Sequence, residues 1–216
     1  MKLLLTSATV FLLFLVISCS KGTSGPNPGS GANSIFPLEQ GNVWYYSDSA
    51  FNDSGVVTNA YADTMTVTKE TYTDANNTIY LGLNNPYGWF DGSFISVDPS
   101  NDAIYEVDSP AYSPYTFFAV ASQDGQVIGT GTDFSNPTCP FYTTQYGYVT
   151  PTMVGTYSCI SNIEYTTDCN NNPQEEIISY VTPGVGVVRI AHFLPDSTGA
   201  ALHEDYSQTL TAATIK

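Results

Sequence analysis

The chain has 216 residues, and its 20 aspartates and glutamates against five lysines and arginines give it a formal net charge of −15. A surface this acidic is repelled by phosphate backbones and by anionic lipid, which excludes nucleic acid as a partner and leaves basic proteins, divalent cations and neutral glycans. The charge also has a simpler explanation in solubility, because acidic surfaces keep exported domains dispersed.

The first 18 residues have the order of a secretory signal peptide. Met1-Lys2 is a short positive start, and the run from Leu3 to Ile17 is apolar except for three hydroxyl residues. A helix of this length spans roughly 22 Å, which is shorter than the roughly 30 Å core of a bilayer. We therefore expect residues 1–18 to be a cleaved leader, with a short retained membrane anchor as the alternative.

The end of this leader carries a recognisable motif. Val16-Ile17-Ser18-Cys19 resembles the lipobox of bacterial lipoproteins, although Val16 stands where the commonest form has leucine. The resemblance implies that Cys19 is lipidated on sulfur and becomes the first residue of the mature chain. Two acyl chains of the palmitate type suffice for stable anchoring. The implied location is the cell envelope, on a membrane that we expect to be the outer membrane.

A tether follows the cysteine. Residues 20–34 are dominated by Gly, Ser, Pro and Asn and contain no large apolar residue, so the segment cannot bury enough surface to fold. Its root-mean-square reach is about 21 Å. The expected organisation is thus a leader (1–18), a lipidated cysteine with its tether (19–34) and a folded domain (35–216). No acidic run follows Cys19, and by resemblance to Bacteroidota lipoproteins this favours the periplasmic side over the cell surface.

The remaining residues are rich in Tyr, Thr, Val and Ile, which favours strands. Turn residues separate short strand-like segments at regular intervals, and this spacing is typical of an antiparallel all-β domain. We expect a single curved sheet, as a half-open barrel or sandwich, with at most one helical turn at Asn172–Glu175. The expected strands include residues 64–68, 78–81, 94–97, 103–107, 116–120, 126–128, 187–191 and 202–210.

Two longer motifs extend the resemblance to the ends of this domain. Phe36-Pro37-Leu38-Glu39-Gln40-Gly41-Asn42-Val43-Trp44-Tyr45-Tyr46 is similar to the opening of uncharacterised Bacteroidota lipoproteins. Tyr180-Val181-Thr182-Pro183-Gly184-Val185-Gly186-Val187-Val188 is similar to their closing motif. The resemblance implies a curved antiparallel sheet or half-open barrel, like that of periplasmic lipoprotein carriers. It implies no reaction.

Three cysteines remain after Cys19, and three single pairings among them are open. A hairpin folded about residue 153 sets Cys139 opposite residue 167, close to Cys169. The same hairpin sets Cys159 opposite Gly147. We therefore predict a disulfide between Cys139 and Cys169, with Cys159 as a buried thiol.

The residues that catalysis or metal binding would need are scarce. The only histidines, His192 and His203, face each other if the last hairpin turns near residues 197–198. With a neighbouring acid they would serve a hydrolase, but a surface pair is the simpler explanation, and two ligands are too few for zinc. The oxygen-rich segments 98–102 and 168–172 lack the pattern of a calcium loop, and turn chemistry accounts for them. We expect no metal, no cofactor and no enzymatic activity.

Aromatic residues are the best indication of binding. The segment 84–91 holds Tyr87, Trp89 and Phe90 beside amides and a carboxylate, a combination that stacks on sugars and bonds to their hydroxyls. The alternative is that these rings only pack, since tyrosine is a good strand residue with a polar tip. We take Tyr87, Trp89 and Phe90 as the candidate ligand contacts.

Two short segments, Asp48-Ser49-Ala50 and Asp63-Thr64-Met65, resemble an O-glycosylation motif used by Bacteroidota. That resemblance implies that these residues lie on the surface of the domain.

Three functions follow from these patterns. The first is a non-catalytic lipoprotein that binds a ligand, a glycan or an envelope protein. The second is a carrier whose sheet encloses a cavity lined by Ile, Val and Phe for a lipid. The third is a hydrolase, which needs His192 and His203 to converge with an acid in a cleft. The first is the function we predict.

Overall fold

The computed structural model describes residues 34–98, 100, 102–108, 113–199 and 201–216. These residues form no helix, and so none that could cross a membrane. The leader, Cys19 and the tether up to residue 33 lie outside the described residues. The strands are β1 (Val43–Phe51), β2 (Val57–Thr73), β3 (Ile79–Asn84), β4 (Phe94–Val97), β5 (Ala103–Val107), β6 (Tyr115–Ala119), β7 (Gln126–Asp133), β8 (Phe141–Val154), β9 (Tyr157–Thr167), β10 (Pro173–Thr182), β11 (Gly186–Pro195) and β12 (Leu202–Thr214).

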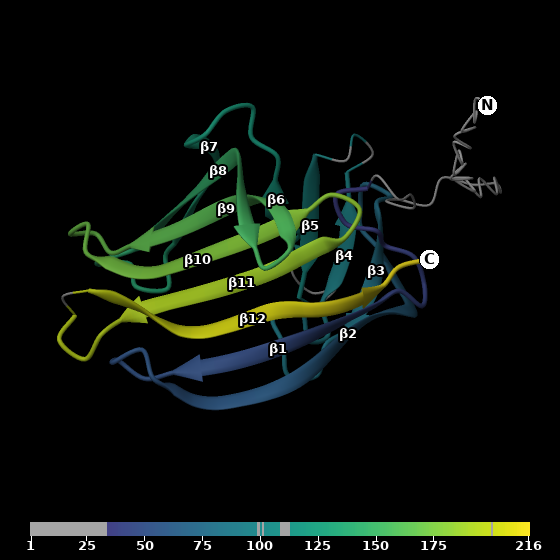
Figure 1. Cartoon of the computed structure of the whole chain (residues 1–216). Coiled ribbons are helices and arrows are strands. Elements are labelled where there is room, and N and C mark those ends of the chain that lie inside the picture. Colours follow the sequence, from purple (N-terminus) through teal and green to yellow (C-terminus); the bar gives the residue numbers. More distant parts are fainter. Residues whose placement is uncertain (1–33, 99, 101, 109–112, 200) are drawn as a thin grey trace, which may run out of the picture.

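All twelve strands belong to one antiparallel sheet with the order β6-β5-β4-β3-β2-β1-β12-β11-β10-β9-β8-β7. Neighbours along the chain are neighbours in the sheet, and β1 pairs with β12 to join the two ends of the domain. The sheet curls into a nearly closed barrel whose seam lies between β6 and β7 (Figure 1). The predicted all-β fold is confirmed, in its half-open barrel form.

Alternation along the strands sets what faces the interior. In β1, Trp44, Tyr46 and Asp48 are buried, while Tyr45 and Ser47 between them are exposed. This period of two is the pleat of a strand with one face inward. Trp44 and Asp48 therefore share the inner face, and the interior changes from apolar to polar along a single strand.

The two end motifs meet at one end of the barrel. The Phe36 and Trp44 rings have centroids 5.0 Å apart. The Trp44 indole N–H donates to the carbonyl of Val185 at 2.6 Å, and the Tyr46 hydroxyl donates to that of Val187 at 2.9 Å. The opening motif thus packs against the turn before β11. This contact explains structurally why the two motifs occur in the same chain.

Glycine is required at that contact. Gly186 has φ +96°, and a Cβ at this position would overlap the Phe36 ring. The glycine therefore permits both the turn and the close approach of the ring. We call the surrounding core the apolar end; its buried side chains are Phe36, Leu38, Trp44, Met65, Val67, Cys159, Val181, Val187, Val188 and Leu210.

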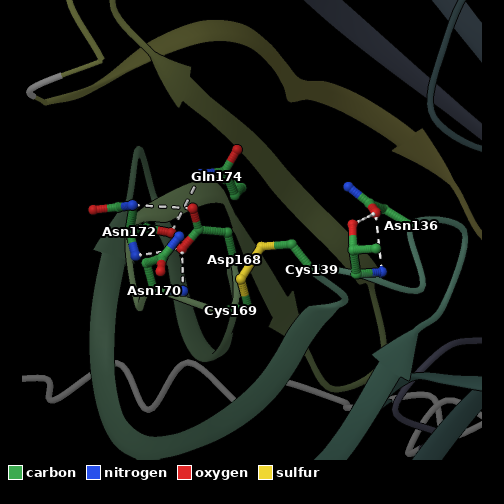
Figure 2. The surroundings of a disulfide bond; sticks show 8 residues. Asn136, Cys139, Asp168, Cys169, Asn170, Asn172 and Gln174 are labelled. Carbon is green, nitrogen blue, oxygen red and sulfur yellow. Dashed lines mark hydrogen bonds between the residues drawn. A yellow bond between two sulfur atoms is a disulfide. The ribbon is translucent and has the colours of Figure 1, made fainter.

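A disulfide joins Cys139 and Cys169, with Cα atoms 5.1 Å apart (Figure 2). It lies at the open end of the β8–β9 hairpin, away from the turn. This is the predicted pairing, and in the chain-entropy model a loop of this length stabilises by roughly 3.6 kcal/mol. The predicted register is wrong in detail, because the turn lies at residues 155–156 and a bulge follows Tyr148. Cys159 consequently faces Thr152 instead of Gly147, and its thiol is fully buried.

The one helical turn that Asn172–Glu175 allowed does not form, because β10 begins at Pro173. The Asp168 carboxylate accepts the backbone N–H groups of Asn170 and Asn172 at 2.8 and 2.9 Å (Figure 2). These bonds close a tight turn in which Asn171 has φ 62°. The chain then returns as a strand, and the oxygens of this segment serve the turn itself.

Candidate functional site

A buried polar network begins where the apolar end stops. Gln208 of β12 points its Nε2 at Asp48 Oδ2, Asp63 Oδ2 and Asn85 Oδ1, at 3.4, 3.5 and 3.4 Å. Burial raises the pKa of Asp48 to about 6; hydrogen bonds from Tyr206 and Gln208 oppose this shift, and the charge of Asp63 adds to it. Asp48 and Asp63 are 0% and 5% exposed, so their expected surface position is wrong: both face the barrel interior.

This network holds the loop between β3 and β4. Asn85 donates to Asp63 and accepts the backbone N–H of Phe90 at 3.2 Å. A Cβ on Gly88 would overlap the side chains of Asn85 and Gln208. Only glycine allows the loop to pass so close, and the loop is thereby packed against the interior of the barrel.

The three candidate aromatic contacts separate within this loop. Phe90 is fully buried, with its ring edge-on to Phe117 at 5.0 Å. Tyr87 is 71% exposed and packs against Tyr61 at 5.9 Å. Trp89 is partly buried and lines an internal cavity. The structure therefore places these rings in three environments, and their role in binding stays a prediction.

The cavity has a volume of about 220 Å³, which is room for about seven water molecules at ~30 Å³ each. The loop, β6, β8, β9 and β10 each contribute to its wall. Tyr115, from the edge strand β6, lines the cavity and is 43% exposed. Its lining consists of Trp89, Tyr115, Phe117, Gln145, Asn162, Glu164, Ile177 and Ser179.

The most informative side chain in this wall is Asn162. It is 2% exposed, and neither its Nδ2 nor its Oδ1 has a hydrogen-bond partner. A buried unpaired polar group costs about 1–3 kcal/mol. By contrast, the Gln145 Nε2 donates to the carbonyl of Phe117 at 3.0 Å, linking β8 to β6 across the seam.

Glu164 is the acid of the cavity. It faces Gln145 across one strand pair and Ile177 across the other. Burial raises the pKa of Glu164, and the charge of Glu175 raises it further. Among the described residues, no hydrogen bond or ion pair is formed by its side chain.

His192 lies beside the cavity but does not line it. Its Nε2 is 2.7 Å from Glu175 Oε1 and its Nδ1 is 2.9 Å from Asp205 Oδ1. The Trp89 ring packs edge-on at 5.8 Å. Burial lowers the pKa of His192, but the hydrogen bond and charge of Glu175 and the charge of Asp205 outweigh it, so the pKa is raised. Both nitrogens are thus held by carboxylates.

The expected facing of the two histidines is wrong. His192 pairs with Tyr206 in β12, and His203 pairs with Leu194. The last turn is longer than predicted, spanning Asp196 to Ala201, and a bulge follows His192. His203 lies instead 3.7 Å from Asp53. The two imidazoles therefore belong to separate ion pairs, and neither is a surface member of a facing pair.

Sequence reasoning missed Gln145, Asn162, Glu164 and Ser179. Each lies in a strand and matches no motif. One signal existed, because Asn162 and Glu164 are two residues apart and so share a face of β9. To use this spacing as a prediction of a site, one would need to know which face of β9 points into the barrel.

No family model and no curated protein matches this chain. Two solved structures resemble it, each with 12% sequence identity and a TM-score of 0.41. One is a candidate lipoprotein from Parabacteroides distasonis, for which the match covers 86% of this chain and all of the other. The second is a candidate exported protein with a YmcC-like fold from Bacteroides fragilis, with 83% and 98% covered. A likeness this distant supports no inference about function.

Proposed function

We propose that the protein is a lipid-anchored, non-catalytic component of the cell envelope. We propose further that it binds a small polar ligand in the cavity that Trp89 lines. The single observation that carries this proposal is the Asn162 amide, which is buried in the cavity wall with both polar atoms unpaired. A ligand that accepts one hydrogen bond and donates another would remove that cost.

The lining supports binding of a polar molecule over transport of a lipid. Asn162, Glu164 and Ser179 would be left without partners by a hydrocarbon chain, and burying unpaired polar groups is unfavourable. The expectation for a carrier was a cavity lined by Ile, Val and Phe; here only Ile177 and Phe117 are of that kind. Aromatic walls with a few convergent polar groups are typical of small-ligand sites.

The geometry also favours binding over hydrolysis. A nucleophile needs a base with a free lone pair beside it. The nearby imidazole, His192, has Glu175 on one nitrogen and Asp205 on the other. In that arrangement it holds β10 and β12 together and has no nitrogen left to accept a proton from a substrate.

The anchor is the second part of the proposal and rests on the lipobox resemblance of Val16 to Cys19. The proposed location is the outer membrane, with the barrel on the periplasmic side. Replacing the cysteine, Cys19→Ser, should stop lipidation and move the protein from the membrane fraction to the soluble fraction. Unchanged membrane retention together with unchanged removal of the leader would contradict this part alone.

The ligand-binding part is tested by a thermal-shift screen of the purified full-length protein against sugars, amino acids and amines. Compounds that stabilise it should bind about tenfold more weakly to Asn162→Leu, which loses a buried hydrogen-bonding group. The matched control is Asn59→Leu, because Asn59 is exposed on β2. If no compound binds, or if bound compounds ignore the change at Asn162, the cavity is not the site.

A further inference from the structure

We propose, as a refinement that rests on the proposed function, that the cavity ligand is a small organic ammonium ion. Its cationic group would sit between the Glu164 carboxylate and the rings of Trp89 and Tyr115. Three observations carry this inference: an acid without a counter-charge, three aromatic rings in one wall, and an interior whose charge is negative.

Glu164 is the carboxylate that lacks a counter-charge. The neighbouring acids Glu175 and Asp205 both contact His192. Within the described residues, the Glu164 side chain has no hydrogen bond and no ion pair, and its cross-strand neighbours Gln145 and Ile177 are uncharged. Burial disfavours its ionised form, and a bound cation would restore that form.

The wall around Glu164 suits a cation. Trp89, Tyr115 and Phe117 supply three rings to a lining of eight residues. The face of an aromatic ring attracts ammonium groups, and a site that combines rings with a carboxylate binds them by charge and by stacking. The Oδ1 of Asn162 has no partner and can accept a hydrogen bond from a primary ammonium or from a hydroxyl on the ligand.

The surrounding charge selects against anions. None of the cavity-lining residues is Lys, Arg or His, and the acids Asp48 and Asp63 are buried in the same barrel. The whole chain carries −15. An acidic interior raises the local concentration of cations and repels carboxylates and phosphates. A neutral sugar would gain nothing from this field.

The test compares choline and ethanolamine with 3,3-dimethylbutan-1-ol, the neutral isostere of choline, by calorimetry on the purified full-length protein at low salt. We expect the ammonium compounds to bind and the isostere to bind about tenfold more weakly. Glu164→Gln should lose about tenfold for choline, because the variant removes the negative charge that would face the quaternary ammonium group. Glu39→Gln removes the same charge from an exposed position and should change binding by no more than about twofold.

A second variant keeps the test decisive if Glu164→Gln folds poorly. Trp89→Leu retains the carboxylate and should weaken choline about fivefold through the lost ring, with circular dichroism checking the fold. Equal binding of choline and its isostere, or choline binding that both variants leave unchanged, overturns the inference. If a neutral sugar binds through Asn162 while ammonium compounds do not, the inference fails and the proposed function stands. If nothing binds, both fail.

Discussion

The apolar end and the cavity lie on the inner face of the same sheet, yet they differ in whether their buried polar atoms have hydrogen-bond partners. At the apolar end, the indole N–H of Trp44 and the hydroxyl of Tyr46 each donate to a backbone carbonyl. In the cavity wall, the amide of Asn162 is buried with no partner. The polar groups of the first region are paired within the chain, whereas in the proposed function those of the second are paired by a ligand.

This difference separates stability from function within one barrel. Paired polar groups and close-packed rings stabilise the apolar end. Unpaired groups destabilise the other region, and they are tolerated because the apolar end offsets their cost. Substitutions at the apolar end should therefore lower the free energy of unfolding, whereas substitutions in the cavity should affect binding.

The largest expected effect is at Trp44. Trp44→Ala removes a fully buried ring that packs on Phe36 and bonds to Val185. Truncations of buried tryptophan leave a cavity and cost about 3–5 kcal/mol. Urea denaturation followed by circular dichroism should show this loss as a lower midpoint.

A matched control for this change is Phe134→Ala. Phe134 is 69% exposed, in the segment between β7 and β8, and its truncation should change stability by less than about 0.5 kcal/mol. Similar losses for both variants would contradict the assignment of the apolar end as the stabilising core.

The second prediction concerns Glu106, an acid buried in the polar part of the barrel. It is 1% exposed, the Ser93 hydroxyl donates to its Oε1 at 2.6 Å, and its Oε2 has no partner. Burial raises its pKa to about 7, while the hydrogen bond from Ser93 acts in the other direction. The folded state therefore holds the proton more tightly than the unfolded chain, whose value is near 4.5.

The sign of the pH dependence follows from this shift. Stability from Glu106 is fully present below about pH 4.5 and is lost as pH rises through about 7, by an amount on the order of 3 kcal/mol. Urea titrations between about pH 5 and 8 should show this decline. His192, whose pKa is also raised, adds a decline of the same sign above its unfolded value.

Glu106→Gln isolates the contribution of Glu106 because His192 is retained. The variant should show a shallower decline and exceed the native protein in stability near pH 8. Glu39→Gln, at an exposed position, should leave the decline unchanged. A slope that Glu106→Gln does not alter would place the effect in other groups.

Local chemistry explains which parts of the fold could be predicted from the sequence. The strands 94–97 and 103–107 match β4 and β5 throughout, because the turn residues between them mark both boundaries. The disulfide followed from hairpin spacing, which tolerates a small error in register. In each case the deciding signal lies within a few tens of residues along the chain.

The cavity could not be predicted in this way. Its wall draws on five separate elements, and which polar residues enter it depends on register. Bulges after Tyr148 and His192 shift that register without a mark in the sequence, and the second contributes to separating the two histidines. The aromatic residues of the loop show the same limit. Tyr87 and Phe90 are both rings in one short segment, yet Tyr87 is exposed and Phe90 is buried.

The smallest expected effect on stability is also the sharpest test of the comparison. Asn162→Leu replaces an unpaired buried amide with an apolar side chain of similar size. Removing an unsatisfied polar group is neutral or stabilising, so the free energy of unfolding should rise by about 1 kcal/mol while ligand binding weakens about tenfold. Trp44→Ala is expected to lower stability and, where the protein remains folded, to leave the cavity residues in place. A large destabilisation by Asn162→Leu in urea titrations would mean that the amide has a structural partner, and the cavity would then no longer be distinguished from the core.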